Sequence, residues 1–286
     1  MSDKMWGGRF DLPMDRLVEE FNATILIEKR VTPFSIKGSL AHVRMLAKQG
    51  ILPASDAEAI LTALDQVARE VQEGQFVFDV ADEDIQMAIE RRVTEIAGVA
   101  GGKMHTARSR NDQAQLDVRL YARSAVDNII TVIRRLQAEI IKKAEDNFGV
   151  MFPGYTHMQT GQPILFSHWM MAYFWMLERD VGRFEDARKR LNICPLGTAA
   201  MAGTGFNIDR DMTAQELGFS APSENSVDTI ADRDHLIEIN SAAATCMMHL
   251  SRLCEEIVFF ATQDFRFFEL SDDFCTGSSI MPNKKN

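Results

Sequence analysis

Apolar residues recur at helical spacing along much of this chain. After Pro53 they recur at helical spacing as far as Val71, which predicts one amphipathic helix. These apolar positions are Ile60, Leu61, Leu64, Val67 and Val71. The run Ser55-Asp56-Ala57-Glu58, shortly after Pro53, has the spacing of a capping box and predicts that the helix begins there.

Residues 82–96 predict a second helix in the N-terminal part of the chain. Acidic residues open it at Asp82-Glu83-Asp84, and Arg91-Arg92 follow later, an order that the helix dipole favours. The acidic run could instead bind a cation, but a helix start accounts for it more simply. We therefore expect a helix and no ion site here.

Longer helices are predicted after residue 102. Residues 103–148 and 223–276 contain neither glycine nor proline. Apolar residues of the first stretch recur at steps typical of a long helix, at Leu116, Leu120, Ile129, Ile133, Leu136 and Ile140. A third helical pattern follows Pro163 and includes Trp169, Phe174, Leu177, Val181 and Phe184.

Strand signals are weak throughout the chain, and residues 194–228, rich in Gly, Pro, Ser, Thr and Asn, predict a long irregular connection. We therefore expect an all-α fold. Residues 1–107 would form a helical N-terminal domain, and residues 108–286 a long-helix bundle.

Helix length bears on assembly. A helix over residues 110–148 would be roughly 58 Å long, whereas a compact globule of this size is about 50 Å across. One chain covers such helices poorly, so we expect a homo-oligomer in which they pack against copies of themselves. The segments 108–113 and 156–162 would lie at opposite ends of this helix, so a site using both must combine different chains.

Composition narrows the class of protein. A formal net charge of -10 and a pI near 5.2 argue against a nucleic-acid surface. No CxxC or Cys/His spacing suggests a zinc site or a disulfide framework. The four cysteines, expected to be reduced thiols in a cytoplasmic protein, are Cys194, Cys246, Cys254 and Cys275. We expect no signal peptide and no membrane span.

The last ten residues carry the most informative chemistry. Gly277-Ser278-Ser279 places two hydroxyls beside a glycine, and Pro282 is followed by Asn283-Lys284-Lys285-Asn286. Gly277 and Pro282 predict a loop. A potential oxygen base, two cations and amide donors suit removal of a proton next to a carboxylate, where fixed donors must meet the developing negative charge. The alternative is a mobile polar tail.

The run GSSIMPNKKN resembles the signature of the fumarase/aspartase superfamily of lyases, and its double lysine is similar to that of the argininosuccinate lyases. Lys103–Gln113 (KMHTARSRNDQ) and Tyr155–Pro163 (YTHMQTGQP) match two further segments of that family in the same order. The opening Met5–Phe10 (MWGGRF) is also similar. Several matches in one order are far more specific than any single one.

This resemblance implies a reaction and an assembly. The reaction is elimination of arginine from argininosuccinate to give fumarate, the last step of arginine biosynthesis, without metal or organic cofactor. The assembly is a cytoplasmic homotetramer whose long helices form a shared bundle, with each site built from three chains. No contact with nucleic acid or membrane is expected.

The resemblance also implies residue roles. Ser278 would be the base, His157 the general acid or its relay, and Lys284 and Asn286 would stabilise the aci-carboxylate. Imidazole suits the acid because it titrates near neutral pH. The residues expected to contact substrate are Thr24, Ser109, Arg110, Asn111, Thr156, Gln159, Arg233 and Asn286. Lys285 is equally compatible with a solvated lysine, and Arg108 with an ion-pair residue.

The chain departs from the family pattern at several places. Glu28 stands where an aspartate is usual and Gln86 where a histidine is usual. The family carries an acidic partner for the histidine beyond the signature, so a chain ending at Asn286 is expected to be a fragment with little activity. Two alternatives remain open: another fumarate-releasing lyase, such as an adenylosuccinate lyase, and a crystallin-like structural protein on the same scaffold.

Overall fold

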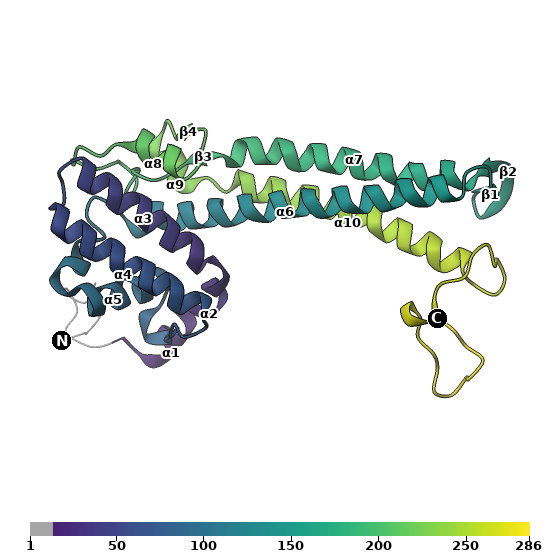
Figure 1. Ribbon diagram of the computed structural model, residues 1–286, viewed down its shortest axis with the longest axis horizontal. Helices are drawn as coiled ribbons and strands as arrows, with labels where there is room; N and C mark the ends of the chain where they lie inside the picture. Colours follow the sequence, from purple (N-terminus) through teal and green to yellow (C-terminus); the bar gives the residue numbers. More distant parts are fainter. Residues whose placement is uncertain (1–13) are drawn as a thin grey trace. The chain divides into compact units, whose positions relative to one another are not determined.

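The computed structural model describes residues 14–286, so the family-like opening Met5–Phe10 lies outside it. Helices make up most of the described chain, which confirms the all-α expectation (Figure 1). They are α1 (Arg16–Asn22), α2 (Ile25–Glu28), α3 (Thr32–Lys48), α4 (Ala54–Gln72), α5 (Ile85–Ala97), α6 (Arg110–Asp146), α7 (Phe166–Leu191), α8 (Arg210–Glu216), α9 (Ser226–Ala231) and α10 (Asp234–Phe260). The strands are β1 (Met151–Thr156), β2 (Gln159–Leu165), β3 (Ile193–Cys194) and β4 (Ala221–Pro222).

The described chain packs as two compact units. Unit 1 contains residues 14–127 and 188–235, and unit 2 contains residues 128–187 and 236–286. This division by packing differs from the predicted one after residue 107, because the first part of α6 and the 188–235 segment pack with the N-terminal helices. Packing units are not the same as domains, so the domain boundary after residue 107 stays a prediction. Within residues 14–286, no helix has the length and apolarity needed to cross a membrane.

An apolar core formed by α3, α4 and α5 organises the N-terminal part of unit 1. Ile60, Leu64 and Val67 of α4 are fully buried against residues that include Val43 of α3 and Ile89 of α5. Burying a side chain of this size contributes roughly 1.5–3 kcal/mol. The helical spacing seen in the sequence therefore marks the buried face of α4 correctly.

Two helix starts differ from those predicted. α4 begins at Ala54 with Pro53 as its N-cap, so Ser55 lies inside the first turn and the predicted capping box is wrong. α5 begins at Ile85, where the Asp84 side chain accepts a hydrogen bond from the backbone N–H of Met87 at 2.7 Å. Asp82 lies outside α5 and pairs with Arg91 at 2.8 Å.

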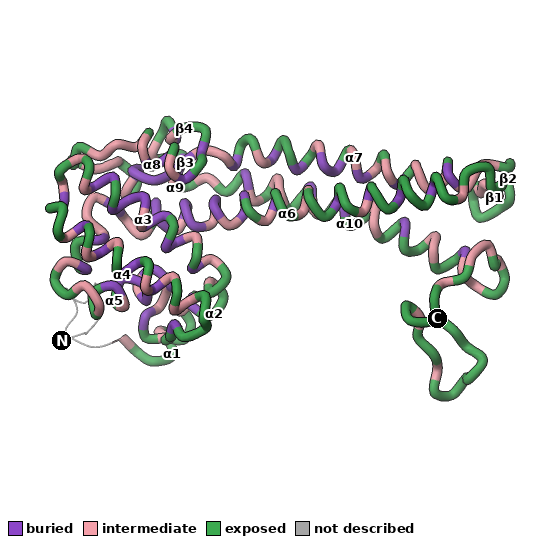
Figure 2. The backbone as a smooth tube through the Cα atoms, viewed as in Figure 1, coloured by how far each residue is buried: buried purple, intermediate pink, exposed green. Residues whose placement is uncertain are grey.

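The 188–235 segment is more ordered than the predicted irregular connection. It contains α8, α9 and the short parallel pair β3–β4. Leu116 and Leu120 of α6 are buried against its residues Leu196 and Leu217. Figure 2 shows the burial along α6 and its neighbours in this unit. The segment is therefore packed onto the first part of α6.

Unit 2 is built on the later part of α6 together with α7 and α10. Gln137 of α6 donates to the carbonyl of Phe174 on α7 at 3.2 Å. The His249 ring of α10 lies 2.7 Å from the carboxylate of Asp180 on α7, which is fully buried. Polar contacts thus tie α7 to both other helices.

An aromatic cluster closes one end of unit 2. The Phe152 ring of β1 lies 5.4 Å from Trp169 of α7, 5.2 Å from Phe260 of α10 and 5.3 Å from Phe267. The Phe152–Phe260 and Phe152–Phe267 pairs are edge-to-face, a geometry that adds stability beyond that of the buried area. The cluster anchors the β1–β2 hairpin to the helices and to the chain that follows α10.

The β1–β2 hairpin was not predicted from the sequence. Thr156 pairs with Gln159, and His157 and Met158 form a two-residue turn with φ angles of 52° and 60°. Two consecutive positive φ angles are typical of a type I′ turn, which joins antiparallel strands without splaying them. That turn normally carries Asn-Gly, so His-Met gave no turn signal, and Pro153 opposite Pro163 obscured the strands.

A buried polar network lies between α3, α5 and α6 in unit 1. Asp117 of α6 accepts a hydrogen bond from the Gln86 side chain at 2.8 Å, and Arg108 donates to the Ser39 hydroxyl at 3.1 Å. Burial raises the pKa of Asp117 to about 7, although Gln86, Ser35 and the Arg108 charge oppose this shift. Folding therefore holds a proton on Asp117 that the unfolded chain would release.

The Asp117→Asn substitution tests this network through its pH dependence. A raised carboxyl pKa contributes stability that is complete below the unfolded value of 3.8 and is lost as pH rises through 7. The variant has no carboxyl group to titrate at this position. Between about pH 5 and about pH 8, the unfolding free energy of the native protein should therefore fall by at least about 1 kcal/mol relative to that of the variant. Urea titrations at both pH values measure the difference, and a pH-independent difference would contradict the shift.

A Met158→Gly substitution tests the strain in the hairpin turn. Met158 has a Cβ atom at a φ of 60°, where glycine has no steric penalty. Glycine should raise the unfolding free energy by about 0.5–1 kcal/mol, after its greater entropy in the unfolded chain is subtracted. Thermal unfolding measures the change. The control Met158→Ala keeps the Cβ atom and should give no such gain; equal effects of the two variants would refute the explanation.

Candidate functional site

Ser109, Arg110 and Asn111 lie at the start of α6, where Ser109 acts as the N-cap. Its hydroxyl accepts the backbone N–H of Asn111 at 3.2 Å, and its carbonyl accepts the N–H of Gln113. The Asp112 side chain accepts the backbone N–H of Ser109 at 3.0 Å in return. This arrangement resembles a capping box with aspartate in the third helical position, except that the serine hydroxyl accepts from the second helical residue instead of the third. The spacing of Ser109 and Asp112 indicates this helix start in the sequence, although it was not among the predicted caps.

Arg110 is held in place by acidic residues of α5 and its cap. Its guanidinium lies 2.7 Å from the Asp84 carboxylate and 4.0 Å from that of Glu90. Burial raises the pKa of both carboxyls, and the Arg110 charge opposes the rise. An anionic ligand that binds Arg110 must therefore share it with Asp84.

Thr24 lies next to the same group of residues. It is exposed, and its backbone N–H donates to the carbonyl of Glu83 at 2.9 Å. Glu83 directly precedes Asp84, the partner of Arg110. The start of α2 and the start of α6 are therefore linked through Glu83-Asp84.

Arg233 lies between α9 and α10, also in unit 1. Its guanidinium donates to the carbonyls of Ile230 at 3.1 Å and Asp232 at 2.8 Å, while the side chain stays exposed. The Gln115 amide of α6 donates to the same two carbonyls. Gln115 lies one helical turn after Asn111. The carbonyls that Gln115 and Arg233 share therefore place Arg233 near the start of α6.

Thr156, His157 and Gln159 lie at the tip of the β1–β2 hairpin in unit 2. All three are exposed, and within residues 14–286 no hydrogen bond to the His157 ring occurs. Thr156 also lines a cavity of about 730 Å³, together with Gln162, His168, Arg252 and Glu256. His157 and Gln159 do not line this cavity.

Ser278, Lys284 and Asn286 belong to the terminal loop, as the glycine and proline positions predicted. Thr276 and Asn286 exchange two backbone hydrogen bonds of 3.0 and 2.8 Å, which close the loop. The half-buried Ser278 hydroxyl accepts the backbone N–H of Met281 at 3.2 Å. The side chains of Lys284 and Asn286 are exposed.

Lys285 has a structural role in this loop. Its ammonium group lies 2.6 Å from the Asp272 carboxylate and 3.0 Å from that of Glu269, and it donates to the carbonyl of Leu270 at 2.8 Å. Hydrogen bonds to the two carboxylates raise the pKa of Lys285 above its ordinary value. Lys285 therefore anchors the loop to the chain before it.

The candidate residues thus form three groups. The first, around the start of α6, contains Thr24, Ser109, Arg110, Asn111 and Arg233; the second is the hairpin tip; the third is the terminal loop. In the described part of unit 2, no hydrogen bond or ion pair joins His157 to Ser278 or Lys284. Residues 14–286 contain no group of three or more His, Cys, Asp or Glu side chains arranged to hold a metal ion.

Comparison with known proteins shows which enzymes the whole chain is similar to. The chain is 53% identical over 284 residues to an argininosuccinate lyase of Pelobacter propionicus, 51% over 286 residues to one of Syntrophotalea carbinolica, and 52% over 284 residues to one of Geobacter metallireducens. These matches cover 99 to 100% of the chain and 62% of each relative.

Solved structures share the fold. A variant of an EDDS lyase with bound fumarate is 33% identical, with a TM-score of 0.84 over 94% of this chain and 53% of that one. A fumarate lyase/delta crystallin from Brucella melitensis, 21% identical, has a TM-score of 0.77 over 93% of this chain and 63% of that one, and supports the fold alone. A family model described as "Lyase" matches residues 8–286. The chain therefore belongs to this lyase family.

Proposed function

We propose that the protein is an argininosuccinate lyase, which splits argininosuccinate into fumarate and arginine in the last step of arginine biosynthesis. The observation that carries this proposal is the identity of 51 to 53% to three proteins of that name across nearly the whole chain. A neighbour of the same fold holds fumarate, which supports fumarate as the product. The chain spans 62% of the length of these relatives, so the activity is proposed for the complete protein.

Ser278 would be the base of the elimination. It would take a proton from the carbon next to a substrate carboxylate, and the electron pair would form the double bond of fumarate as the carbon–nitrogen bond breaks. The N–H of Met281, 3.2 Å from the Ser278 hydroxyl, is a fixed donor that would stabilise a negatively charged oxygen. Lys284 and Asn286 would stabilise the aci-carboxylate. The proposed steps use only side chains and backbone N–H groups of the protein.

The remaining candidates would bind substrate or donate a proton. Ser109, Arg110 and Asn111 lie at a helix start, where backbone N–H groups and the helix dipole favour an anion. Thr24 and Arg233 are linked to that start by the contacts described above. His157 would protonate the departing nitrogen directly or by relay, with Thr156 and Gln159 beside it on the hairpin.

We further propose a homo-oligomer, with a tetramer as the expected form and with sites shared between chains. The 37-residue helix α6 is roughly 56 Å long, so its first residue and the hairpin beyond its end cannot both reach one small substrate in a single chain.

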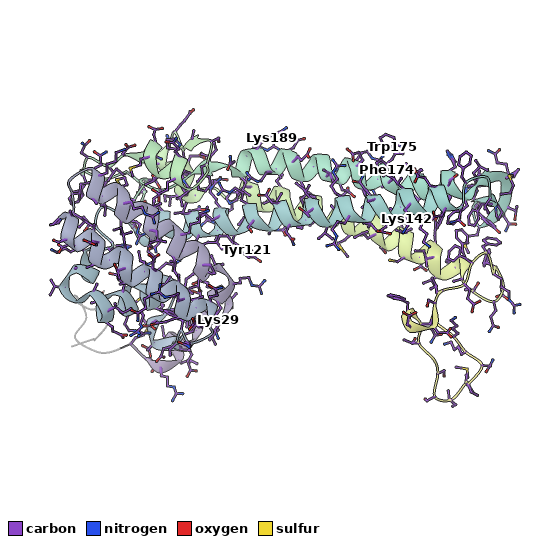
Figure 3. All side chains as sticks on the ribbon, in the orientation of Figure 1. Lys29, Tyr121, Lys142, Phe174, Trp175 and Lys189 are labelled. Carbon is purple, nitrogen blue, oxygen red and sulfur yellow. The ribbon has the colours of Figure 1, made fainter. Side chains whose placement is uncertain are left out.

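Exposed apolar residues on the helices of unit 2 support this packing. They include Val132, Trp175, Ile237, Met247, Met248 and Val258. Trp175, 58% exposed, points outward from α7 (Figure 3).

The free cysteines agree with the proposed cytoplasmic location.

The experiment that tests the function is release of fumarate from purified, full-length protein, followed by its ultraviolet absorbance. Argininosuccinate and adenylosuccinate are supplied in parallel. Turnover of argininosuccinate alone supports the proposal. Turnover of adenylosuccinate alone would assign the alternative lyase, and turnover of neither would favour a structural role on the same scaffold.

Ser278→Ala tests the base. Its kcat should fall about a thousandfold, while KM stays within about threefold, because the hydroxyl acts mainly in the transition state. The matched control is Ser279→Ala, which removes the neighbouring exposed hydroxyl and should stay within about threefold of native kcat. Near-normal turnover by Ser278→Ala would remove Ser278 from this role.

Complementation tests sites shared between chains. Asn111→Ala and His157→Ala each inactivate one of two segments that lie at opposite ends of α6. When the two full-length variants are unfolded together and refolded, some sites should receive both native segments and regain up to about a quarter of native activity, since mixed tetramers contain such sites. Each variant refolded alone is the control, and a mixture no more active than these controls would contradict the shared site.

A further inference from the structure

Asp112, the third residue of α6, has a carboxylate that is fully removed from solvent. One oxygen accepts the backbone N–H of Ser109 at 3.0 Å. The other accepts the backbone N–H groups of Gly197 at 3.0 Å and Ala199 at 2.9 Å. A single buried side chain therefore joins two segments of unit 1 that lie 85 to 87 residues apart along the chain.

Asn111 makes a second contact between the same two segments. Its side-chain amide donates to the carbonyl of Ala200 at 3.0 Å. Asp112 thus accepts hydrogen bonds from the 197–200 loop, and its neighbour Asn111 donates one to it. The position of the exposed Asn111 side chain consequently depends on where this loop is held.

The 197–200 loop has two residues with positive φ angles, which glycine tolerates at residue 197 but which are unfavourable for Ala199. Ala199 has a φ of 51°, which is unfavourable for a residue with a Cβ atom. Gly197 has a φ of 94°, and a Cβ atom there would lie 2.8 Å from side-chain atoms of Ile208 and Arg210. External contacts must hold this geometry, and the Asp112 carboxylate binds the backbone on both sides of Thr198.

We propose that Asp112 is a positioning residue that fixes Ser109, Asn111 and the 197–200 loop as one unit of the substrate-binding site. It acts through these segments and does not itself touch substrate. This inference rests on the proposed function, because the role of Ser109 and Asn111 in binding substrate belongs to that function. The carboxylate geometry itself does not depend on it.

The test compares Asp112→Asn with Asp117→Asn in the full-length protein. An asparagine at residue 112 is neutral and has one oxygen acceptor instead of two. Its oxygen therefore binds the Gly197 and Ala199 N–H groups less strongly than the carboxylate does, and its NH2 group cannot accept from Ser109. Asp117 is a second buried aspartate of α6 that does not contact the loop, and its variant is the matched control.

Hydrogen exchange of the 197–200 amides is the first measurement. These amides should exchange about tenfold faster or more in Asp112→Asn than in the native protein, with no change in Asp117→Asn. In the native protein, the amides of Gly197 and Ala199 should also exchange more slowly than that of Gly205. Equal rates at these positions in the native protein would overturn the proposal even where Asp112→Asn fails to fold.

Kinetics separate positioning from folding alone. For Asp112→Asn we expect KM for argininosuccinate to rise about tenfold with kcat within about threefold, because ground-state binding groups are displaced. Faster loop exchange with an unchanged KM would overturn the positioning role. A native protein that does not split argininosuccinate would refute the proposed function, and the exchange measurement would still decide whether Asp112 holds the loop.

Discussion

The fold of unit 1 depends on how the first part of α6 satisfies its buried polar side chains. Asp112 binds backbone N–H groups at residues 197 and 199, and Gln115 binds three carbonyls between residues 229 and 232. Arg119 pairs with Asp232, and Arg123 donates to the carbonyls of Leu217 and Gly218. A buried polar group without a partner costs about 1–3 kcal/mol, so each contact also specifies which segment must lie there. The 188–235 segment is thereby held on α6 by directional bonds as well as by apolar packing.

Helical spacing in the sequence was sufficient to predict the long helices. The pattern after residue 102 marks α6, and Leu116 and Leu120 lie on its buried side as the spacing requires. Helix starts were harder to predict, because a cap depends on the chain that precedes it. Pro53 provides the extended residue before α4, so the Ser55 spacing was misleading. The similar spacing of Ser109 and Asp112 does mark a helix start that side chains cap.

Long-range contacts explain what the sequence could not predict about the candidate site. Nothing near Asp112 in the sequence indicates that its partners are Gly197 and Ala199. The hairpin likewise depends on Phe152 packing against Phe260 and Phe267, from a segment more than one hundred residues away. The residue types and the loop at residues 277–286 could be predicted locally, while the grouping of Thr24, Asn111 and Arg233 around one helix start required the fold.

The two kinds of candidate residue differ in how firmly they are held. Ser109 and Asn111 lie at a helix start that the buried Asp112 side chain joins to residues 197 and 199, and Asn111 adds a hydrogen bond to the carbonyl of Ala200. The loop that carries Ser278 is closed by backbone hydrogen bonds at its ends and anchored by exposed ion pairs of Lys285, a kind of contact worth little in water. Segments with few buried contacts open at low free-energy cost. Under the proposed roles, substrate would bind at the firmly held helix start, and the weakly held loop would bring the base to it and exclude water after binding.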